Sequence, residues 1–509
     1  MIGVCGGSAR THGQEPVRVR LPMVEVGVAL VITLAQPRAR WCEPDAAAGR
    51  LSDVGAAGAL WGSEETAMRC GRGVGVRVLV WSMALAVGAA VPGCAGGDGS
   101  DAAPSVAPTP EVVDGSSWTR IEDPEGVFGR RDETSVRLSE VVAGGPGYVA
   151  VGSYGQGRHG EGGTVAAVWT SVDGTVWERV AHDDGVFGAF GMGRFTAASA
   201  VTTGGPGLVA VGVEADGEAL VALAWLSVDG RSWTRVEVDD PRVRGATDLE
   251  LHAIADTDEG LVTVGIERGG PAGAPEYLAV WRSNDGVDWT PIALTPEEDA
   301  AAWGYLSTVT VHDGQVVAAG ATDGPDGQRW VATVWHGHDT SGLVRIPHED
   351  EVFGGPGMPW IHGVTVGGPG LVAVGTTHSH HLDDPQWSPA AVWTSTDGAT
   401  WARVTHDDEV FGVDDNATMY DVTATPWGIV AVGTRILGWD DPAQMRFIGT
   451  VWTSPDGLAW TRLVDADGTF SGDGHTSLTA ITVGPSGLVA VGEVGAGDGS
   501  TIGAVWTSP

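Results

Sequence analysis

The sequence predicts an all-β fold, a seven-bladed β-propeller of four-stranded antiparallel blades. Two observations predict it. First, a Gly-apolar-Val-Ala-Val-Gly run recurs seven times at intervals of 53 to 60 residues, and most copies precede an Asp-Gly turn flanked by tryptophans. Second, the segment that opens the repeated region completes the repeat that closes it. A unit of this length forms four strands but cannot bury both sheet faces alone, which favours a ring of stacked units.

Each repeat supplies a second strand and a third strand in a fixed order, and five of the seven continue into the same turn. The glycine-rich runs lie at 147–152, 207–212, 260–265, 315–320, 370–375, 428–433 and 487–492. The third strands end in Trp169, Trp225, Trp281, Trp335, Trp393, Trp452 and Trp506. A Ser-x-Asp-Gly-x-x-Trp turn follows at 171–177, 227–233, 283–289, 395–401 and 454–460. Asp-Gly between apolar runs predicts a tight hairpin, because glycine accepts positive φ and Asp and Ser side chains accept bonds from turn amides. The fourth repeat, at 336–346, lacks this turn.

The two ends of the repeated region are complementary. The chain stops at 504–509 after a third strand, whereas 114–123 has the turn and fourth strand that this repeat lacks. Joined, the two pieces would nearly repeat the segment at 452–462. We therefore expect the first strand to complete the last blade and close the ring, which removes exposed sheet edges.

The N-terminal part predicts export. Residues 69–77 are basic and 78–91 are apolar, in the order of a signal peptide, and the apolar run is shorter than the ~20 residues of a spanning helix. Val-Pro-Gly-Cys at 91–94 resembles a bacterial lipobox, which implies lipid attachment at Cys94; an ordinary cleaved signal or a short anchor is the alternative. We expect 1–67 to be a spurious or disordered extension before a start at Met68, 68–94 a lipoprotein signal, 95–113 a flexible tether and 114–509 the propeller.

The net negative charge of the chain excludes one class of binding partner. The chain has 28 Lys and Arg against 65 Asp and Glu, a net charge of −37, which repels nucleic acid. We expect a monomer that is exported, extracytoplasmic and held at the membrane by its lipid alone. An unidentified protein, glycan or cation is the expected partner. No cysteine follows Cys94, so the repeated region has no disulfide.

The Ser-x-Asp-Gly-x-x-Trp turn resembles the Asp box of sialidase-type (BNR) propellers. In that family the box is a structural turn on the face opposite the ligand site. The resemblance therefore implies structural roles for Asp173, Asp229, Asp285, Asp397 and Asp456.

The resemblance raises the question of enzymatic activity. Sialidases of this family use three arginines on the substrate carboxylate, a Tyr–Glu nucleophile pair and an acidic Asp. Arg345-Ile346-Pro347 is similar to an Arg-Ile-Pro of that family, but it aligns with the outer-strand Trp-Thr-Arg-Val segments of the other repeats. The arginines of those segments are interpreted as scaffold: Arg120, Arg179, Arg235, Arg403 and Arg462. We therefore predict no catalytic residues and a non-catalytic binding scaffold, with a sialidase-like glycoside hydrolase as the alternative.

The candidate ligand site is the upper mouth of the central channel. Aligned inner strands share one polar position, occupied by Ser139, Ser199, His252, Ser307, His362, Tyr420 and Thr479. The next position holds Glu140 and Asp421 among small residues. We expect Glu140, His252, His362, Tyr420 and Asp421 to form the site because they break the symmetry of the ring. The alternative is a water-filled channel lining.

Two further features suggest metal binding. The inter-blade loops at 182–188, 348–354 and 406–412 repeat His with adjacent acids and Val-Phe-Gly; alternatively Val-Phe packs between blades and the acids are solvated. The loop at 377–389 occurs in one repeat only and contains His378, His380, His381, Asp383 and Asp384. These side chains suggest Ca²⁺ or Zn²⁺, and a solvated loop is the alternative. We expect no other cofactor.

Overall fold

The computed structural model describes residues 63–70, 74–81 and 117–509, apart from 124, 131–133, 158–160, 217–218, 239–247, 269–275, 296–303, 326–329, 339–340, 356, 379–387, 413–415, 439–443, 466, 472–474 and 496–500. The chain divides into two compact units, Met1–Pro104 and Ser105–Pro509. In the first unit, β1 (Ser63–Cys70) and β2 (Val74–Trp81) pair as an antiparallel hairpin. Cys94 and the predicted tether lie outside the described residues. None of the helices that the structure describes is long and apolar enough to cross a bilayer.

The second unit is nearly all β, as predicted, and is built of four-stranded antiparallel groups. The inner strands are β4 (Thr134–Gly144), β8 (Arg194–Gly204), β12 (Asp248–Thr257), β17 (Gly304–His312), β21 (Met358–Gly367), β25 (Asn416–Thr425) and β29 (His475–Gly484). The second strands are β5 (Gly147–Gln156), β9 (Gly207–Asp216), β13 (Gly260–Arg268), β18 (Gln315–Asp323), β22 (Gly370–His378), β26 (Gly428–Leu437) and β30 (Gly487–Gly495). The glycine-rich runs begin these second strands.

The outer half of each group holds the tryptophans. The third strands are β6 (Thr164–Ser171), β10 (Ala219–Ser227), β14 (Glu276–Ser283), β19 (Trp330–His338), β23 (Ala390–Ser395), β27 (Arg446–Ser454) and β31 (Thr501–Ser508). The fourth strands are β7 (Trp177–Arg179), β11 (Thr234–Glu237), β15 (Trp289–Ile292), β20 (Gly342–Arg345), β24 (Trp401–Arg403), β28 (Thr461–Arg462) and β3 (Thr119–Arg120). The tryptophan that ends each third strand is at most 1% exposed, so each group has a large apolar anchor at the same point.

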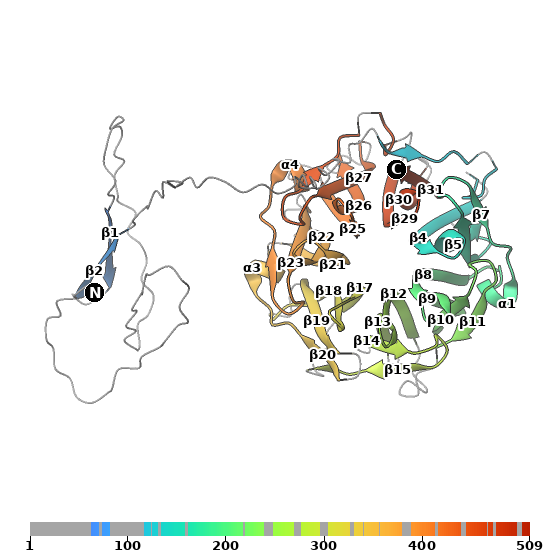
Figure 1. Ribbon diagram of the computed structural model, residues 1–509, viewed down its shortest axis with the longest axis horizontal. Helices are drawn as coiled ribbons and strands as arrows, with labels where there is room; N and C mark the ends of the chain where they lie inside the picture. Colours follow the sequence, from blue (N-terminus) through green and yellow to red (C-terminus); the bar gives the residue numbers. More distant parts are fainter. Residues whose placement is uncertain are drawn as a thin grey trace, which may run out of the picture. The chain divides into compact units, whose positions relative to one another are not determined.

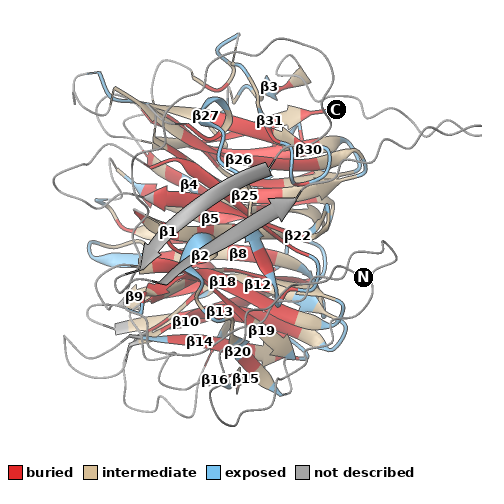
Figure 2. Cartoon of the chain, turned by 90° about the vertical axis from the view of Figure 1, so that its left-hand side faces the viewer, coloured by how far each residue is buried: buried red, intermediate tan, exposed pale blue. Residues whose placement is uncertain are grey.

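The groups stand around a common centre, with their first strands innermost (Figure 1). Each inner strand lies beside the inner strand of the next group, and β29 lies beside β4. The apolar clusters lie between successive groups; one, for example, joins Val136 and Trp169 of the first group to Val489 and Val505 of the last. Buried positions run along the strands, and exposed ones gather at their ends (Figure 2). The core is therefore a set of packed interfaces between sheets.

The last group takes its fourth strand from the start of the unit. Thr119 of β3 pairs with Thr507 of β31, and Arg120 pairs with Trp506. Trp118 is 3% exposed and lies in the same apolar cluster as Trp506. The segments that the sequence predicts to be halves of one sheet are thus hydrogen-bonded neighbours.

The fourth group departs from the predicted four strands. An additional strand, β16 (Leu294–Thr295), pairs in parallel with β20, and the sheet has five strands. Leu343 N also donates a hydrogen bond to the Ala293 carbonyl, 2.8 Å away. This group lacks the Asp-Gly-Trp turn, and the chain arriving from the third group pairs with its outer edge.

Candidate functional site at the inner strands

Each inner strand carries a β-bulge at the same place, and each bulged residue is polar. In β4, Leu138 pairs with Gly152 and Glu140 pairs with Val151, which leaves Ser139 as the extra residue. The seven bulged residues are Ser139, Ser199, His252, Ser307, His362, Tyr420 and Thr479. They are the same residues that the sequence alignment places at the shared polar position. A bulge bends the strand and re-aims side chains, and bulges are over-represented next to active sites.

The last glycine of each repeated run lies opposite a bulge because no side chain fits there. A Cβ on Gly375 would lie 1.9 Å from the carbonyl oxygen of Trp360, and a Cβ on Gly433 would lie 1.9 Å from that of Thr418. The five equivalent residues, at 1.9 to 2.1 Å from the facing carbonyl, are Gly152, Gly212, Gly265, Gly320 and Gly492. None of these has left-handed φ, so close backbone approach is the reason for glycine. The repeated run therefore encodes the bulge as well as the strand.

Five aromatic side chains form a continuous wall across four neighbouring inner strands, which we call the aromatic arc. The arc consists of His252 on β12, Tyr305 on β17, Trp360 and His362 on β21, and Tyr420 on β25. The centroids of successive rings are 3.8, 5.5, 5.4 and 5.6 Å apart. The Trp360 indole N–H donates to Ser307 Oγ, 2.6 Å away, which fixes the indole ring. Tyr420 is 36% exposed and Tyr305 and Trp360 are half-buried, so the arc is partly accessible.

The two histidines of the arc are part of its framework. His252 Nδ1 lies 3.0 Å from the Leu306 carbonyl oxygen of the next inner strand, and its ring stacks on Tyr305. Burial lowers the pKa of His362 to about 4, so this side chain is neutral at physiological pH. The His252 side chain is only 6% exposed, and both imidazoles therefore support the neighbouring rings of the arc.

Two carboxyl groups, Glu140 and Asp421, lie beside the end of the arc, and we call them the carboxylate pair. Asp421 accepts hydrogen bonds from the backbone N–H groups of Val422 (2.7 Å) and of Ile481 on β29 (2.8 Å). Burial nevertheless raises the pKa of Asp421 to about 6. Burial and the nearby charge of Asp421 raise the pKa of Glu140 well above its usual value, while a bond from Val141 N opposes the shift. Because two like charges so close disfavour double ionisation, the pair favours the state in which one carboxyl keeps its proton.

The arc and the carboxylate pair meet at Tyr420, which precedes Asp421 in the chain. Burial and the charge of Glu493 raise the pKa of the Tyr420 hydroxyl, whereas the Arg137 guanidinium lowers it. Among the described residues, Arg137 is the one arginine that contributes to this shift. A sialidase-type site implies three converging arginines, and the shift of the Tyr420 pKa identifies one of the described arginines, Arg137, as a neighbour.

The Asp-box turns lie near the C-terminal ends of the inner strands. In the turn at 395–401, Ser395 Oγ accepts from Gly398 N (2.8 Å), and Asp397 Oδ1 accepts from the N–H groups of Ala399 (2.9 Å) and Thr400 (2.7 Å). The same bonds recur at Asp173, Asp229, Asp285 and Asp456. These bonds lower the pKa of each carboxyl, as expected of a charge held by amides. The turn of the second group packs on the β4–β5 turn, since a Cβ on Gly230 would lie 3.1 Å from Pro146.

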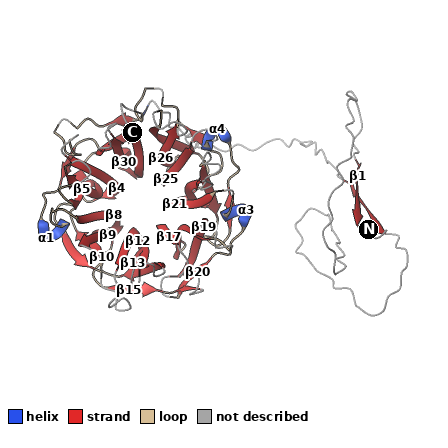
Figure 3. Cartoon of the chain, turned by 180° about the vertical axis from the view of Figure 1, so that it is seen from behind, coloured by secondary structure: helices blue, strands red, loops and turns tan. Residues whose placement is uncertain are grey.

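The acidic inter-blade loops are packing elements. They contain the short helices α1 (Asp184–Phe187), α3 (Asp350–Phe353) and α4 (Asp408–Phe411), at the outer rim of the ring (Figure 3). The phenylalanine that ends each helix is at most 4% exposed, and the acids are exposed. The carbonyls before these phenylalanines accept the buried tryptophan N–H groups, as Val186 does from Trp225 at 2.7 Å. In the described part of the chain, no three His, Cys, Asp or Glu side chains are placed to hold a metal ion.

The other metal candidate is the loop at 377–389. The side chains of His378, His380, His381, Asp383 and Asp384 lie outside what the structure describes.

Sequence reasoning missed Tyr305, Trp360 and Arg137. All three lie two residues before a bulge, on the same side of the strand as the bulged residue. Extending the inner-strand alignment by two positions would have placed them beside the predicted site, as strand alternation requires.

The outer-strand arginines lie where the sequence alignment places them. Arg345 on β20 pairs with Trp335, as Arg235 on β11 pairs with Trp225, so the Arg-Ile-Pro segment is far along the sheet from the inner strands.

Solved structures similar to this chain include glycoside hydrolases. Trypanosoma rangeli sialidase is 11% identical, with a TM-score of 0.40, and the match covers 65% of this chain and 56% of that one. The α-L-arabinanase of Penicillium chrysogenum is 14% identical, with a TM-score of 0.35 and coverage of 61% and 92%. The chain thus spans little more than half the length of the trypanosome enzyme. No family model and no curated protein matches.

Proposed function

We propose that the chain is a carbohydrate-binding β-propeller of the cell envelope, with its ligand held against the aromatic arc. The observation that carries the proposal is the row of touching rings, 3.8 to 5.6 Å apart, on four inner strands. Aromatic faces are apolar and carry a partial negative charge, so they stack on the C–H faces of sugar rings. Carboxyl and hydroxyl groups beside the arc, from Glu140, Asp421 and Tyr420, are suitable partners for sugar hydroxyls.

The scaffold of this proposal is a closed ring of seven blades. Two observations support closure: the pairing of β3 with β31, and the apolar cluster that joins the last group to the first. Closure keeps the inner strands in fixed relation, which a wall spread over four blades requires.

The charge around the arc indicates the class of sugar. Glu140, Asp421 and Glu493 lie near its end, and Arg137 is the cation that acts on Tyr420. An anionic sugar such as sialic acid would meet an excess of carboxylates without a cationic clamp. A neutral oligosaccharide avoids this repulsion, and we propose that class.

Titration with an oligosaccharide panel tests this function. Gluco-, xylo- and arabino-oligosaccharides, with sialyllactose as the anionic member, are added while tryptophan fluorescence is recorded. We expect at least one neutral member to bind, and Trp360→Ala and Tyr305→Ala to weaken it tenfold or more; Thr400→Val, in an Asp-box turn, is the matched control. Absence of binding by every neutral member, tighter binding of sialyllactose, or full binding by Trp360→Ala would overturn the proposal.

The carboxylate pair favours glycoside hydrolysis as a second candidate function. A glycosidase needs one carboxyl that is protonated near neutral pH and one that is charged. Burial raises the pKa of Asp421 to about 6, and burial with the charge of Asp421 raises the pKa of Glu140, which favours a proton shared by the pair. The pair lies beside the arc, where a bound sugar would present its glycosidic bond.

Hydrolysis is tested on the oligosaccharide that binds. Product release by the wild-type chain, reduced 100-fold or more in Glu140→Gln with binding retained, is the expected result if the pair is catalytic. Binding without turnover would leave the carbohydrate-binding function and remove the enzymatic one.

The envelope location rests on the predicted lipid at Cys94. We propose attachment there because a basic segment, an apolar run and a Gly-Cys pair occur in that order. Expression in a bacterium with labelled palmitate should mark the wild-type chain and leave Cys94→Ser unmarked. Equal labelling of both would remove the anchor.

A further inference from the structure

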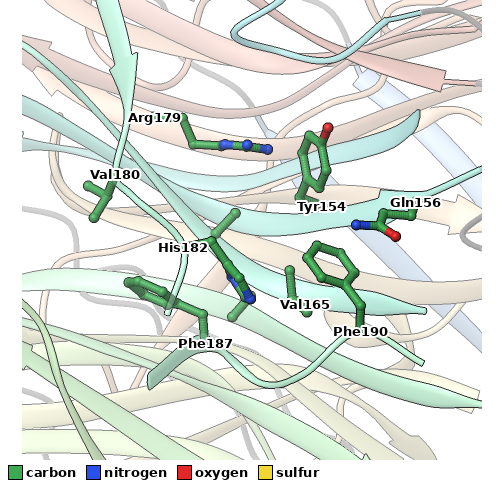
Figure 4. A pocket seen from close by; sticks show the side chains of 10 residues that line it. Tyr154, Gln156, Val165, Arg179, Val180, His182, Phe187 and Phe190 are labelled. Atoms are coloured by element: carbon green, nitrogen blue, oxygen red, sulfur yellow. The ribbon is translucent and has the colours of Figure 1, made fainter. Parts of the chain in front are cut away.

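A cavity of about 140 Å³ lies in the first group, and none of the residues that line it belongs to an inner strand (Figure 4). Its walls come from β5, β6, β7 and the segment that contains α1. Tyr154, His182, Phe187 and Phe190 supply aromatic surface, and Arg179 lies over the Tyr154 ring with its guanidinium carbon 3.9 Å from the centroid. Phe190 packs on both His182 and Tyr154, with ring centroids 4.9 and 6.4 Å away. The cavity is therefore lined by aromatic rings with one guanidinium at its edge.

The equivalent place in the second group is filled by an ion pair. Both Tyr154 and Glu214 are the eighth residue of their second strand, and Arg179 and Arg235 each pair with the buried tryptophan of their third strand. Arg235 binds both carboxylate oxygens of Glu214, through Nη1 at 3.1 Å and Nη2 at 2.5 Å. A tyrosine in place of the glutamate removes this carboxylate from the first group.

The guanidinium of Arg179 is left without an acceptor by this exchange. Contact with Tyr154 uses the face of the guanidinium, whereas its five N–H donors lie in the guanidinium plane and point outward from its edges. In the part of the chain that the structure describes, Arg179 has neither a hydrogen bond nor an ion pair. In the fourth group, Arg345 Nη2 donates to Thr322 Oγ1, 2.7 Å away, so that arginine is also supplied with an acceptor by its second strand.

We propose that this cavity binds a small aromatic carboxylate, with its ring among Tyr154, His182 and Phe190 and its carboxylate on Arg179. The carboxylate would take the place that Glu214 occupies in the second group, where a guanidinium fork matches two oxygens. His182 is oriented by Asp184, with Nε2 2.8 Å from Oδ1, so the imidazole is held as part of the wall. The site stands apart from the aromatic arc and does not rest on the function proposed for it.

Size and charge both favour this ligand. A cavity of about 140 Å³ accepts a single six-membered ring and excludes an oligosaccharide. On a chain of net charge −37, a guanidinium with free donors is a rare place where a small anion is attracted. The site is open to solvent, because Arg179 is exposed, and we expect weak binding with a Kd on the order of 1 mM.

Fluorine NMR with 4-fluorobenzoate tests the proposal, with 4-fluorobenzamide as a neutral probe of the same shape. We expect the wild-type chain to bind the acid at least tenfold more tightly than the amide. Arg179→Gln should lose this preference. Tyr154→Glu, which rebuilds the ion pair of the second group, should abolish binding while keeping the fold.

Arg235→Gln is the matched control, since its guanidinium is already paired, and it should bind the acid like the wild-type chain. Thermal unfolding of each variant establishes that it is folded. Equal affinity for acid and amide, unchanged binding by Arg179→Gln, or equal loss in Arg235→Gln would overturn the proposal.

Discussion

The Asp-box turns recur in five of the seven groups and the inner strands in all seven, yet the two regions differ in how closely the side chains repeat. The turns keep the same Ser, Asp, Gly and Trp with nearly the same bonds, such as Ser to Gly N at 2.8 to 2.9 Å in all five. The inner strands keep only the bulge and its facing glycine. At the bulge and two residues before it, side chains range from Ala197 to Trp360.

This difference separates the turns, which stabilise the four-stranded groups, from the inner strands, whose side chains vary. The bulge is a backbone device that is identical in all seven strands, so the side chains around it can vary without altering the fold. Variation gathers in strands β12 to β25 as aromatic rings and in β4 and β25 as the carboxylate pair. A ligand that contacts these residues therefore meets side chains that differ from strand to strand, although the backbone of the inner strands repeats.

The largest effect is expected when the shared backbone device is broken. Gly375→Ala places a Cβ 1.9 Å from the Trp360 carbonyl oxygen, and the bulge under the arc must move. We expect a loss of at least about 3 kcal/mol in the free energy of unfolding, and loss of sugar binding, both measured by urea titration and fluorescence. Gly314→Ala is the contrast: its φ is +72° but nothing lies within 4 Å, so about 1 kcal/mol is expected. A smaller cost for Gly375→Ala than for Gly314→Ala would contradict the bulge argument.

A turn variant should alter stability and leave the ligand site intact. Ser395→Ala leaves the buried N–H of Gly398 without its acceptor, which costs about 1–3 kcal/mol. Binding at the arc should stay within twofold of the wild-type chain, in contrast to Trp360→Ala. Thr400→Val, whose hydroxyl makes an exposed 3.3 Å bond to Asp397, should change stability by less than about 0.5 kcal/mol. A large loss of sugar binding in Ser395→Ala would contradict the proposed separation between the turns, which stabilise the fold, and the inner strands, which bind the ligand.

The sequence predicted the repeated parts well because local chemistry sets them. Asp-Gly turns, alternating apolar strands and the complementary ends each depend on residues close in the chain or on pairing that completes a unit. The polar bulge position was also found, since all seven strands align. Of the arc, His252, His362 and Tyr420 were predicted. Trp360 was not, because the chain has 22 tryptophans, and the sequence does not distinguish one that lines a site from the many that belong to the core.

Other features depend on neighbours that the sequence does not reveal. The coupling of Glu140 and Asp421 requires β4, β29 and β25 to lie side by side, and β16 joins the fourth group only through its free edge. The cavity beside Arg179 appears only when Tyr154 and the segment at 182–190 are brought together.

Within the site, removal of one charge from the carboxylate pair should stabilise the chain. Glu140 has a raised pKa in the folded state, so its favourable contribution is complete below its unfolded pKa and is lost as the pH rises through the folded value. Glu140→Gln keeps an oxygen for Val141 N and removes the repulsion with Asp421. We expect equal stability near pH 4 and a gain of about 1 kcal/mol by pH 8, measured by urea unfolding across this range. The exposed Glu178→Gln should show no such trend, and a less stable Glu140→Gln at pH 8 would contradict the coupling.

The smallest effect is expected at Tyr148, a residue that differs from its equivalents in the other groups but lies outside the ligand site. Tyr148 stands where the other second strands have Leu208, Leu261, Val316, Leu371, Ile429 and Leu488. Its ring is fully buried, and its hydroxyl accepts from Ser486 N at 3.0 Å in the turn between β29 and β30, so it joins the first group to the last. Tyr148→Phe should cost only about 0.5–1 kcal/mol, because water can reach the exposed Ser486 amide. Sugar binding should be unchanged, and hydrogen exchange at Ser486 should be faster. If Tyr148→Phe instead weakens sugar binding at the arc, the contact between the first and last groups affects the inner strands. Tyr148 would then belong to the ligand site as well as to the contact between these groups.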